Sequence, residues 1–149
     1  MRLKEYIQTK RIIADGAFGT YYMSLYGDGS KPEKGLAISN LPELANITAP
    51  ERVIGIHTEY IEAGAQLIRT NTFASNTKSL LSDTEAVKEN IRAAVTCAKA
   101  AAEKAEHEIY IAGDIGPIPA EGVPHSDNLT KEYIMIGETF IEQGIDILL

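Results

Sequence analysis

Three apolar runs of this chain each end in a side chain that can bind a small polar ligand. These side chains are Asp15, Asn71 and Asp114. The runs lie in the segments 11–20 (RIIADGAFGT), 66–73 (QLIRTNTF) and 109–119 (IYIAGDIGPIP). If each run is a buried parallel strand, all three side chains lie at strand carboxyl ends, where α/β folds collect their binding groups. The pattern therefore predicts one wall of an active site.

The turn after the first run joins a carboxylate to closely spaced glycines. Gly16 and Gly19 allow a tight turn in which backbone N–H groups, including that of Ala17, can face a ligand. The Asp15 carboxylate attracts an ammonium and repels a phosphate, which favours a small zwitterion over a nucleotide. The spacing also lacks the G-x-G-x-x-G pattern of dinucleotide sites. A second interpretation is that Asp15 caps the element that follows.

The second and third runs end in short hydrogen-bonding side chains. Thr70 and Thr72 are predicted to face one side of the strand and Asn71 the other, because side chains alternate. All three are candidate ligand contacts, and their simpler role is to satisfy loop backbone. Asp114 could orient a ligand or hold its loop through an Asx turn. The local pattern favours the loop-holding roles.

The segments between the runs have the pattern of helices. Helical spacing, a proline in a first turn and glycine stops predict helices over about 50–64, 84–105 and 130–144, with Thr130 as an N-cap. A fourth apolar run, 145–149 (IDILL), follows. Strands and helices thus alternate, which predicts an α/β fold with a parallel sheet and helices outside it.

Composition narrows the class of protein. A net charge of −7, from 14 basic and 21 acidic residues, argues against a nucleic-acid or anionic-membrane surface. No apolar run approaches the roughly 18 residues that span a bilayer, and the first residues lack the apolar core of a signal peptide. The single cysteine, Cys97, fits a reducing compartment. We therefore expect a cytoplasmic protein with neither nucleic acid nor membrane as a partner.

The histidines and the cysteine are not predicted to form a catalytic or metal site. His57 lies on the inward stripe of its helix, and Cys97 lies among alanines in mid-helix, so both are predicted to be packed structural residues. His107, near a helix end, can interact with the helix dipole, and His125 lies in a loop on the functional face. No set of these side chains and carboxylates has the spacing of a zinc site.

The motifs DGAFGT, NLPELANITAPERVIGIHTEYIEAGAQLIRTNTF and GDIGPIP, in this order and spacing, resemble the homocysteine S-methyltransferase family. The resemblance covers essentially the whole chain. It is nearest to the N-terminal homocysteine module of bacterial methionine synthases and of bifunctional enzymes that join it to a methylenetetrahydrofolate reductase. It implies a TIM (β/α)8 barrel, in which zinc held by three cysteines binds homocysteine as a thiolate. This thiolate attacks an activated methyl group to give methionine.

The resemblance also implies roles for single residues. Asp15 matches the aspartate that meets the substrate ammonium, and the Gly16–Ala17 turn matches the backbone that receives its carboxylate. Asn71 and the threonines beside it match the site residues of the second strand. The methyl donor stays open among a methylated folate or corrinoid, betaine and S-methylmethionine. C-terminal reductase, cobalamin or folate domains are further expectations.

Two parts of the family's site are expected beyond Leu149. These are the cysteine ligands of zinc, none of which Cys97 matches, and a glutamate after the fourth strand that contacts the amino group. Four strand–helix units are half of a barrel that takes about 250 residues. We therefore expect residues 1–149 to be the N-terminal half of the barrel domain, with its first four strands, and to be inactive alone.

Strand order distinguishes this half-barrel from other architectures. A half-barrel keeps consecutive strands as neighbours with every helix on one side, and we expect it to expose Ile13, Ile68, Ile111 and Leu148 on one surface or its edge. A complete doubly wound α/β protein that binds a small ligand without catalysis is the alternative, with reversed order and helices on both sides. An assembly or regulatory fragment would bind no ligand. The irregular stretch Tyr26 to Asn46 is a candidate lid.

Overall fold

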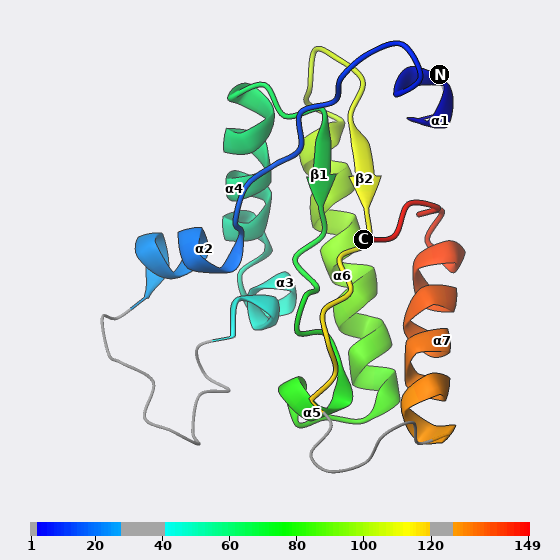
Figure 1. The fold of residues 1–149 in the computed structure, drawn as a ribbon. Helices are drawn as coiled ribbons and strands as arrows, with labels where there is room; N and C mark the ends of the chain where they lie inside the picture. The colour runs from blue at the N-terminus through cyan, green and yellow to red at the C-terminus, as the bar shows by residue number, and fades with distance from the viewer. Residues whose placement is uncertain (1–2, 28–40, 120–126) are drawn as a thin grey trace.

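Two short parallel strands and a set of helices make up the chain in a computed structural model that describes residues 3–27, 41–119 and 127–149 (Figure 1). The elements are α1 (Leu3–Tyr6), α2 (Gly19–Tyr26), η2 (Pro42–Leu44), α3 (Ala45–Thr48), α4 (Pro50–Glu62), β1 (Leu67–Arg69), α5 (Thr77–Leu80), α6 (Thr84–Ala102), β2 (Tyr110–Ala112) and α7 (Asp127–Glu142). The predicted α/β class is confirmed. None of the helices in these ranges combines the length and apolarity required to cross a bilayer.

The three long helices begin and end largely where local signals place them. Pro50 occupies the first turn of α4, and Gly64 and Gly144 adopt positive φ angles of 104° and 75° just beyond α4 and α7. Asp83 caps α6 by accepting a hydrogen bond from the N–H of Ala86. Because these signals act between residues close in sequence, the positions of the helices can be predicted from the sequence.

Two helix boundaries were predicted wrongly. The α6 helix ends at Ala102 rather than Ala105, because bonds from Lys104 N to Ala101 O and from Ala105 N to Ala102 O tighten the chain into turns. Helix α7 begins at Asp127 rather than at Thr130, because the residues before Thr130 already adopt helical conformation. Thr130 is therefore not an N-cap.

The strand segments pair in parallel in the order of the sequence. In the sheet, Leu67 of β1 pairs with Tyr110 of β2. Segment 11–15 pairs with β1 through Ala14 and Leu67, and segment 147–149 pairs with the end of β2 through Gly113 and Leu148. The bonds from Asp15 N to Leu67 O (2.9 Å) and from Leu149 N to Gly113 O (2.9 Å) belong to these pairings.

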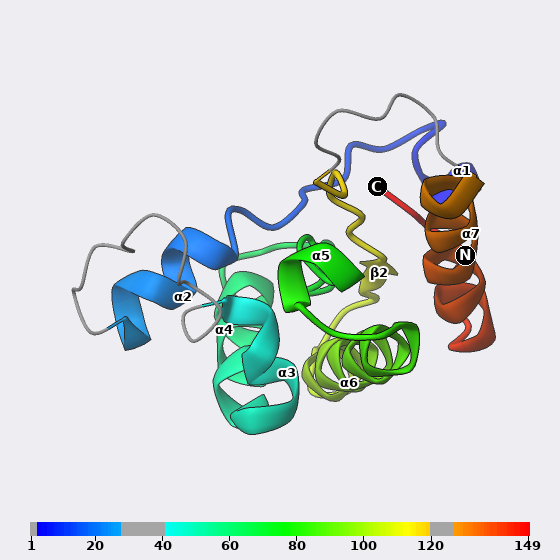
Figure 2. The same ribbon diagram turned by 90° about the horizontal axis from the view of Figure 1, so that it is seen from below.

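The helices lie on one side of these strands. Seen along the strands, segment 11–15, β1, β2 and the C-terminal segment form an open arc, with α4, α6 and α7 along its outer side (Figure 2). Helix α6 packs against both α4 and α7. Consecutive neighbours and one-sided helices are the features expected of a half-barrel, and the described strands show no reversal of order of the kind expected in a doubly wound sheet.

The core lies between the strands and the outer helices. Ile68 is fully buried among Ile61 of α4 and Ala98 of α6. Ile13 and Leu148 are 60% and 41% exposed, as predicted. The expectation that Ile68 is exposed with them is wrong, because alternation turns its side chain toward the helices, and Ile111 packs half-buried against the same layer.

The proposed lid falls mostly on residues 28–40, which lie outside the described ranges. Its last residues are not irregular, since η2 and α3 occupy 42–48. Asn46 and Ala45 of this part are buried against the α4–α6 layer. The C-terminal part of the segment is therefore part of the packed fold.

Candidate functional site

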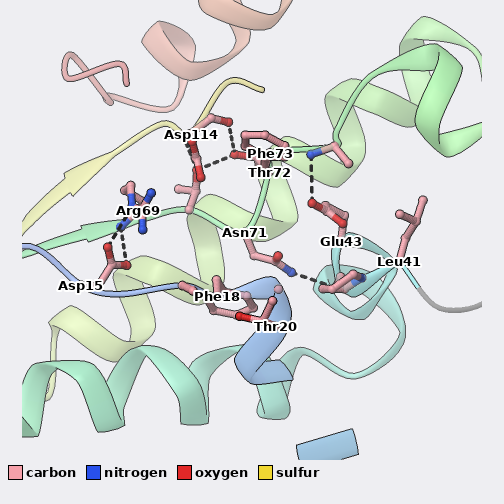
Figure 3. A pocket seen from close by; sticks show the side chains of 15 residues that line it. Asp15, Phe18, Thr20, Leu41, Glu43, Arg69, Asn71, Thr72, Phe73 and Asp114 are labelled. Carbon is pink, nitrogen blue, oxygen red and sulfur yellow. Dashed lines mark hydrogen bonds and ion pairs between the residues drawn. The ribbon is translucent and has the colours of Figure 1, made fainter. Parts of the chain in front are cut away.

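A cavity of about 510 Å³ opens at the carboxyl ends of the strands (Figure 3). It is lined by the turn after the first strand segment, by the ends of β1 and β2, and by η2. Its charged lining residues are Asp15, Glu43, Arg69 and Asp114, which we call the charged cluster. Phe73, 56% exposed, also lines the cavity. The four charged side chains come from four separate segments that the sheet and η2 bring together.

Arg69, the last residue of β1, holds the Asp15 carboxylate. The Oδ1 atom lies 3.0 Å from Arg69 Nε, and Oδ2 accepts from the Arg69 backbone N–H at 2.9 Å. The Asp15 side chain is only 1% exposed, whereas that of Arg69 is 34% exposed. The hydrogen bond to Asp15 raises the pKa of Arg69, and burial opposes this shift. Asp15 is thus paired, and the interpretation that it caps the next element is wrong.

The turn that follows Asp15 is held through its carbonyl groups. Arg69 Nη2 donates to Gly16 O at 2.7 Å, and the Tyr60 hydroxyl donates to Ala17 O at 2.8 Å. A Cβ atom on Gly16 would lie 2.9 Å from the Tyr60 hydroxyl oxygen, so a larger residue there would displace the Tyr60 side chain. Helix α2 starts at Gly19 with no side-chain cap. No described residue accepts from the N–H groups of Gly16 or Ala17, which leaves them for a ligand.

Thr70 and Thr72 hold the backbone at Asp114. Their hydroxyl oxygens are 2.7 Å apart, Thr72 Oγ1 donates to Asp114 O at 2.7 Å, and Asp114 N donates to Thr70 Oγ1 at 3.1 Å. Both threonines are buried, on the same side of the strand as predicted, and their loop-holding role is confirmed. The expected Asx turn is not formed within the described ranges, where the half-buried Asp114 carboxylate has no hydrogen bond.

Asn71 belongs to a buried network that we call the asparagine cluster, made of Asn46, Asn71, Ser75 and Asn90. Asn71 Nδ2 donates to Pro42 O at 2.8 Å and to Asn46 Oδ1 at 3.0 Å. Asn90 Oδ1 accepts from Asn46 Nδ2 at 3.0 Å and from Ser75 Oγ at 2.8 Å. Asn71 lines the cavity, but its amide nitrogen is engaged in joining β1 to η2 and α3.

Glu43 of η2 is buried and half satisfied. Its Oε1 accepts from the N–H of Ala74 at 2.9 Å, whereas Oε2 has no partner among the described residues. Burial raises the pKa of Glu43, the backbone N–H groups of Ala74 and Glu43 lower it, and the negative charge of Asp114 raises it. Burial likewise raises the pKa of Asp114, while Arg69 opposes the shift. Burial thus disfavours the charged forms of both acidic side chains.

The sequence profile described as homocysteine S-methyltransferase matches residues 12–149. The chain belongs to the homocysteine S-methyltransferase family. Methionine synthase from Mycobacterium leprae (strain TN) is 26% identical over 154 residues, and methionine synthase from Mycobacterium tuberculosis (strain ATCC 25618 / H37Rv) is 29% identical over 157 residues. Each alignment covers 98% of this chain and 12% of the relative.

Solved structures of the homocysteine methyltransferase MmuM from Escherichia coli share the fold of this family member. The oxidized form matches with a TM-score of 0.73 at 22% identity, and the metallated form with 0.73 at 19% identity. Both matches cover 98% of this chain and 55% of the MmuM chain. The chain thus spans about half the length of MmuM and a much smaller share of the methionine synthases.

This homocysteine S-methyltransferase family member has no group of three His, Cys, Asp or Glu side chains placed to hold a metal ion within the described ranges. Cys97 is buried in α6, and burial raises the pKa of its thiol to about 11. A protonated thiol packed beside Ala45 and Val53 does not fit a zinc ligand. The prediction of a structural Cys97 is confirmed by this burial.

The predictions for the three histidines differ in how far the structure tests them. His57 is fully buried beneath the Phe18 ring, 5.0 Å between ring centroids, and neither ring nitrogen has a partner among the described residues. Its structural placement is confirmed. His107 lies beyond the end of α6 and contacts Ala65 O at 3.2 Å. Its interaction with the helix dipole stays a prediction. His125 lies outside the described ranges.

Sequence reasoning missed Arg69, Glu43 and Tyr60 in this family member. A signal existed for Arg69, because a charged residue closing an apolar run near a predicted carboxylate needs a partner. Glu43 lies in a stretch interpreted as irregular, where no local pattern indicates burial. Tyr60 lies within the predicted helix 50–64, where helical spacing gives no sign that its hydroxyl donates to Ala17 O.

Proposed function

We propose that the complete protein is a homocysteine S-methyltransferase that transfers a methyl group to the homocysteine sulfur and forms methionine. The main support for this proposal is the cavity at the strand ends, which combines carboxylates, a guanidinium and turn N–H groups without an acceptor among the described residues. A zwitterionic amino acid needs a carboxylate for its ammonium and N–H donors for its carboxylate. Family membership supports homocysteine as that amino acid.

The proposed substrate contacts are Asp15, Gly16, Ala17, Thr70, Asn71, Thr72 and Asp114, with different kinds of role. The turn N–H groups receive the α-carboxylate, since both turn carbonyls are already bound by Arg69 and Tyr60. Asp15 or Asp114 supplies negative charge for the ammonium. Thr70, Asn71 and Thr72 shape the cavity wall through their hydrogen bonds. Holding both ends of the amino acid orients the sulfur for attack on the methyl donor.

The proposed fold of the complete domain is a TIM (β/α)8 barrel, of which residues 1–149 form the first half. The support is the 1-2-3-4 order of parallel strand segments, the one-sided helices and the match to about half of MmuM. The exposed Ile13 and Leu148 would then face the other half. We expect the chain to be inactive by itself.

Zinc dependence is an expectation for the complete protein, with the ligands beyond Leu149. The described residues do not fit a zinc site, as the thiol of Cys97 shows, so no step of the reaction is assigned to the metal here. Methylated folate or corrinoid, betaine and S-methylmethionine remain candidate methyl donors. C-terminal reductase, cobalamin or folate domains and a cytoplasmic location are part of the same proposal.

The test is methionine formation by the complete protein from L-homocysteine and each candidate donor in turn, with titration calorimetry of homocysteine binding. We expect saturable binding and turnover with one donor class. The matched comparison is the segment 1–149 alone, which should form no methionine. Absence of homocysteine binding by well-folded complete protein would overturn the proposal.

A further inference from the structure

The turn that follows Asp15 has no buried side chain of its own to fix its conformation. Gly16 and Ala17 are both exposed. Glycine also loses more conformational freedom on ordering than any other residue. Asp15 precedes the turn and Phe18 follows it, and both line the cavity (Figure 3). The conformation of the turn at the cavity therefore depends on contacts from other elements.

Helix α4 supplies two of these contacts, from side chains one helical turn apart. The Tyr60 hydroxyl donates to Ala17 O at 2.8 Å, and the His57 ring packs against the Phe18 ring with 5.0 Å between centroids. His57 is fully buried and Tyr60 is half-buried. Within the described ranges Tyr60 is not part of the cavity lining, so it contacts the turn from the side of the helix.

The bond to Ala17 O sets the direction of the next N–H group. In a planar trans peptide the C=O and the following N–H point in opposite directions. Because the Ala17 carbonyl points at Tyr60, the N–H of Phe18 points away from α4, and no described residue accepts from it. In the same way, the bond from Arg69 Nη2 to Gly16 O directs the N–H of Ala17. Helix α4 and strand β1 thus each orient one peptide of the turn.

The Tyr60 side chain is itself held against the turn. Its ring lies 5.9 Å from the Tyr21 ring, with the two planes inclined by 72°. A Cβ atom on Gly16 would lie 3.1 Å from Tyr60 Cε1, so the ring is seated directly over the glycine. Burial and the negative charge of Asp15 raise the pKa of Tyr60, and Arg69 opposes this shift. The hydroxyl therefore stays protonated, and it remains a donor at neutral pH.

We propose that Tyr60 is a positioning residue that holds the turn 16–18 from α4 in the conformation that accepts the substrate. This inference rests on the proposed function, which assigns the turn N–H groups to the substrate carboxylate. The Tyr60 hydroxyl makes no contact with the substrate, and it contributes by reducing the freedom that the turn loses on binding. This contribution is equal in the ground state and the transition state, so it acts on affinity and not on the reaction step.

Tyr60→Phe in the complete protein removes the hydroxyl and keeps the ring. Without ligand, we expect the nitrogen-15 order parameters of the Ala17 and Phe18 amides to fall from about 0.85, typical of rigid backbone, to below about 0.6. The KM for L-homocysteine should rise about fivefold, which corresponds to one ordinary hydrogen bond, while kcat stays within about twofold.

Tyr6→Phe is the matched control, because it removes a hydroxyl at the other end of β1. That hydroxyl accepts from Gln66 Nε2 at 2.8 Å, and Gln66 directly precedes the strand. We expect this variant to keep the order parameters of the turn and the KM of the wild type. The melting temperature of each variant, measured beside the wild type, checks that both proteins are folded.

Three results would contradict the inference. Unchanged order parameters in Tyr60→Phe would show that the turn is ordered without the hydroxyl, and an unchanged KM would show that its order does not matter for binding. A fall in kcat at saturating homocysteine would place Tyr60 in the reaction step. Wild-type protein that binds no homocysteine would refute the proposed function, whereas the order parameters, measured without ligand, would still decide whether Tyr60 holds the turn.

Discussion

The asparagine cluster and the charged cluster meet at the same end of the strands and differ in how far their polar groups are satisfied. Asn90 uses its amide nitrogen for Glu43 O at 2.8 Å and its oxygen for two further bonds. In the charged cluster, Glu43 Oε2, the Asp114 carboxylate and part of the Arg69 guanidinium lack described partners. Saturated polar groups hold a fold together, whereas unsaturated ones are available to a ligand.

The largest expected effect is the removal of the centre of the asparagine cluster. Asn90→Leu keeps the side-chain size but leaves the groups of Asn46, Ser75 and Glu43 unpaired in the interior. At about 1–3 kcal/mol for each unsatisfied group, we expect a loss of about 4 kcal/mol in the free energy of unfolding, measured with urea. Glu89→Leu, on the exposed face of α6, is the control and should change stability by less than about 0.5 kcal/mol. A similarly small effect of Asn90→Leu would contradict the conclusion that the asparagine cluster stabilises the fold.

His57 is a buried side chain without a described hydrogen-bond partner that lies under Phe18 of the cavity wall, and we expect it to affect stability rather than ligand binding. Burial lowers the pKa of His57 to about 4, below the ordinary 6.5. A base with a lowered folded-state pKa contributes stability above about pH 6.5 and loses it as the pH falls toward 4. The loss is on the order of 3 kcal/mol. His57→Phe should flatten this acid limb in urea titrations between pH 4 and 7, while His107→Gln should keep it. An unchanged limb in His57→Phe would assign acid sensitivity to other groups.

Glu43 of the charged cluster also contacts the asparagine cluster, since its carbonyl accepts from Asn90 while its side chain lines the cavity. Burial raises its pKa, so its contribution to stability is present below the ordinary value and lost as the pH rises through the raised one. Glu43→Gln keeps an acceptor for Ala74 N–H and removes the buried charge. We expect stability at neutral pH to rise by about 1 kcal/mol relative to wild type, and the gain to vanish in acid. Glu103→Gln on the exposed end of α6 is the control, and a loss of stability at neutral pH would show that the charge has an unseen partner.

Cys97 gives the smallest expected effect, because its thiol makes one long polar contact within the described ranges, 3.9 Å from Sγ to Asn46 O. Cys97→Ala removes one buried sulfur and should cost about 1 kcal/mol or less, with turnover of the complete protein within about twofold. Burial raises the pKa of the thiol to about 11, so a disulfide reagent should label native protein only after unfolding. Rapid labelling of folded protein, or loss of bound metal in the alanine variant, would contradict the structural role.

Local signals account for the part of the fold that was predictable. Helix α6 follows from an apolar face with an aspartate cap, and the ends of α4 and α7 follow from glycines with positive φ angles. The positions of the strand segments follow from their apolar runs. Asp15 and Asp114 were candidate ligand contacts because each ends an apolar run, although the local pattern favoured a loop-holding role for Asp114, and both line the cavity.

What the sequence determined by itself is thus the α/β class, the placement of the elements and the strand ends that carry the polar groups. Only the tertiary structure decided which polar groups satisfy one another. Asp15 meets Arg69 across 54 positions of sequence, and Asn46 meets Asn90 across 44. The physical reason is that periodicity and caps act within a few residues, whereas hydrogen-bond saturation in a buried cluster depends on side chains from segments that only the packed sheet and helices bring into contact.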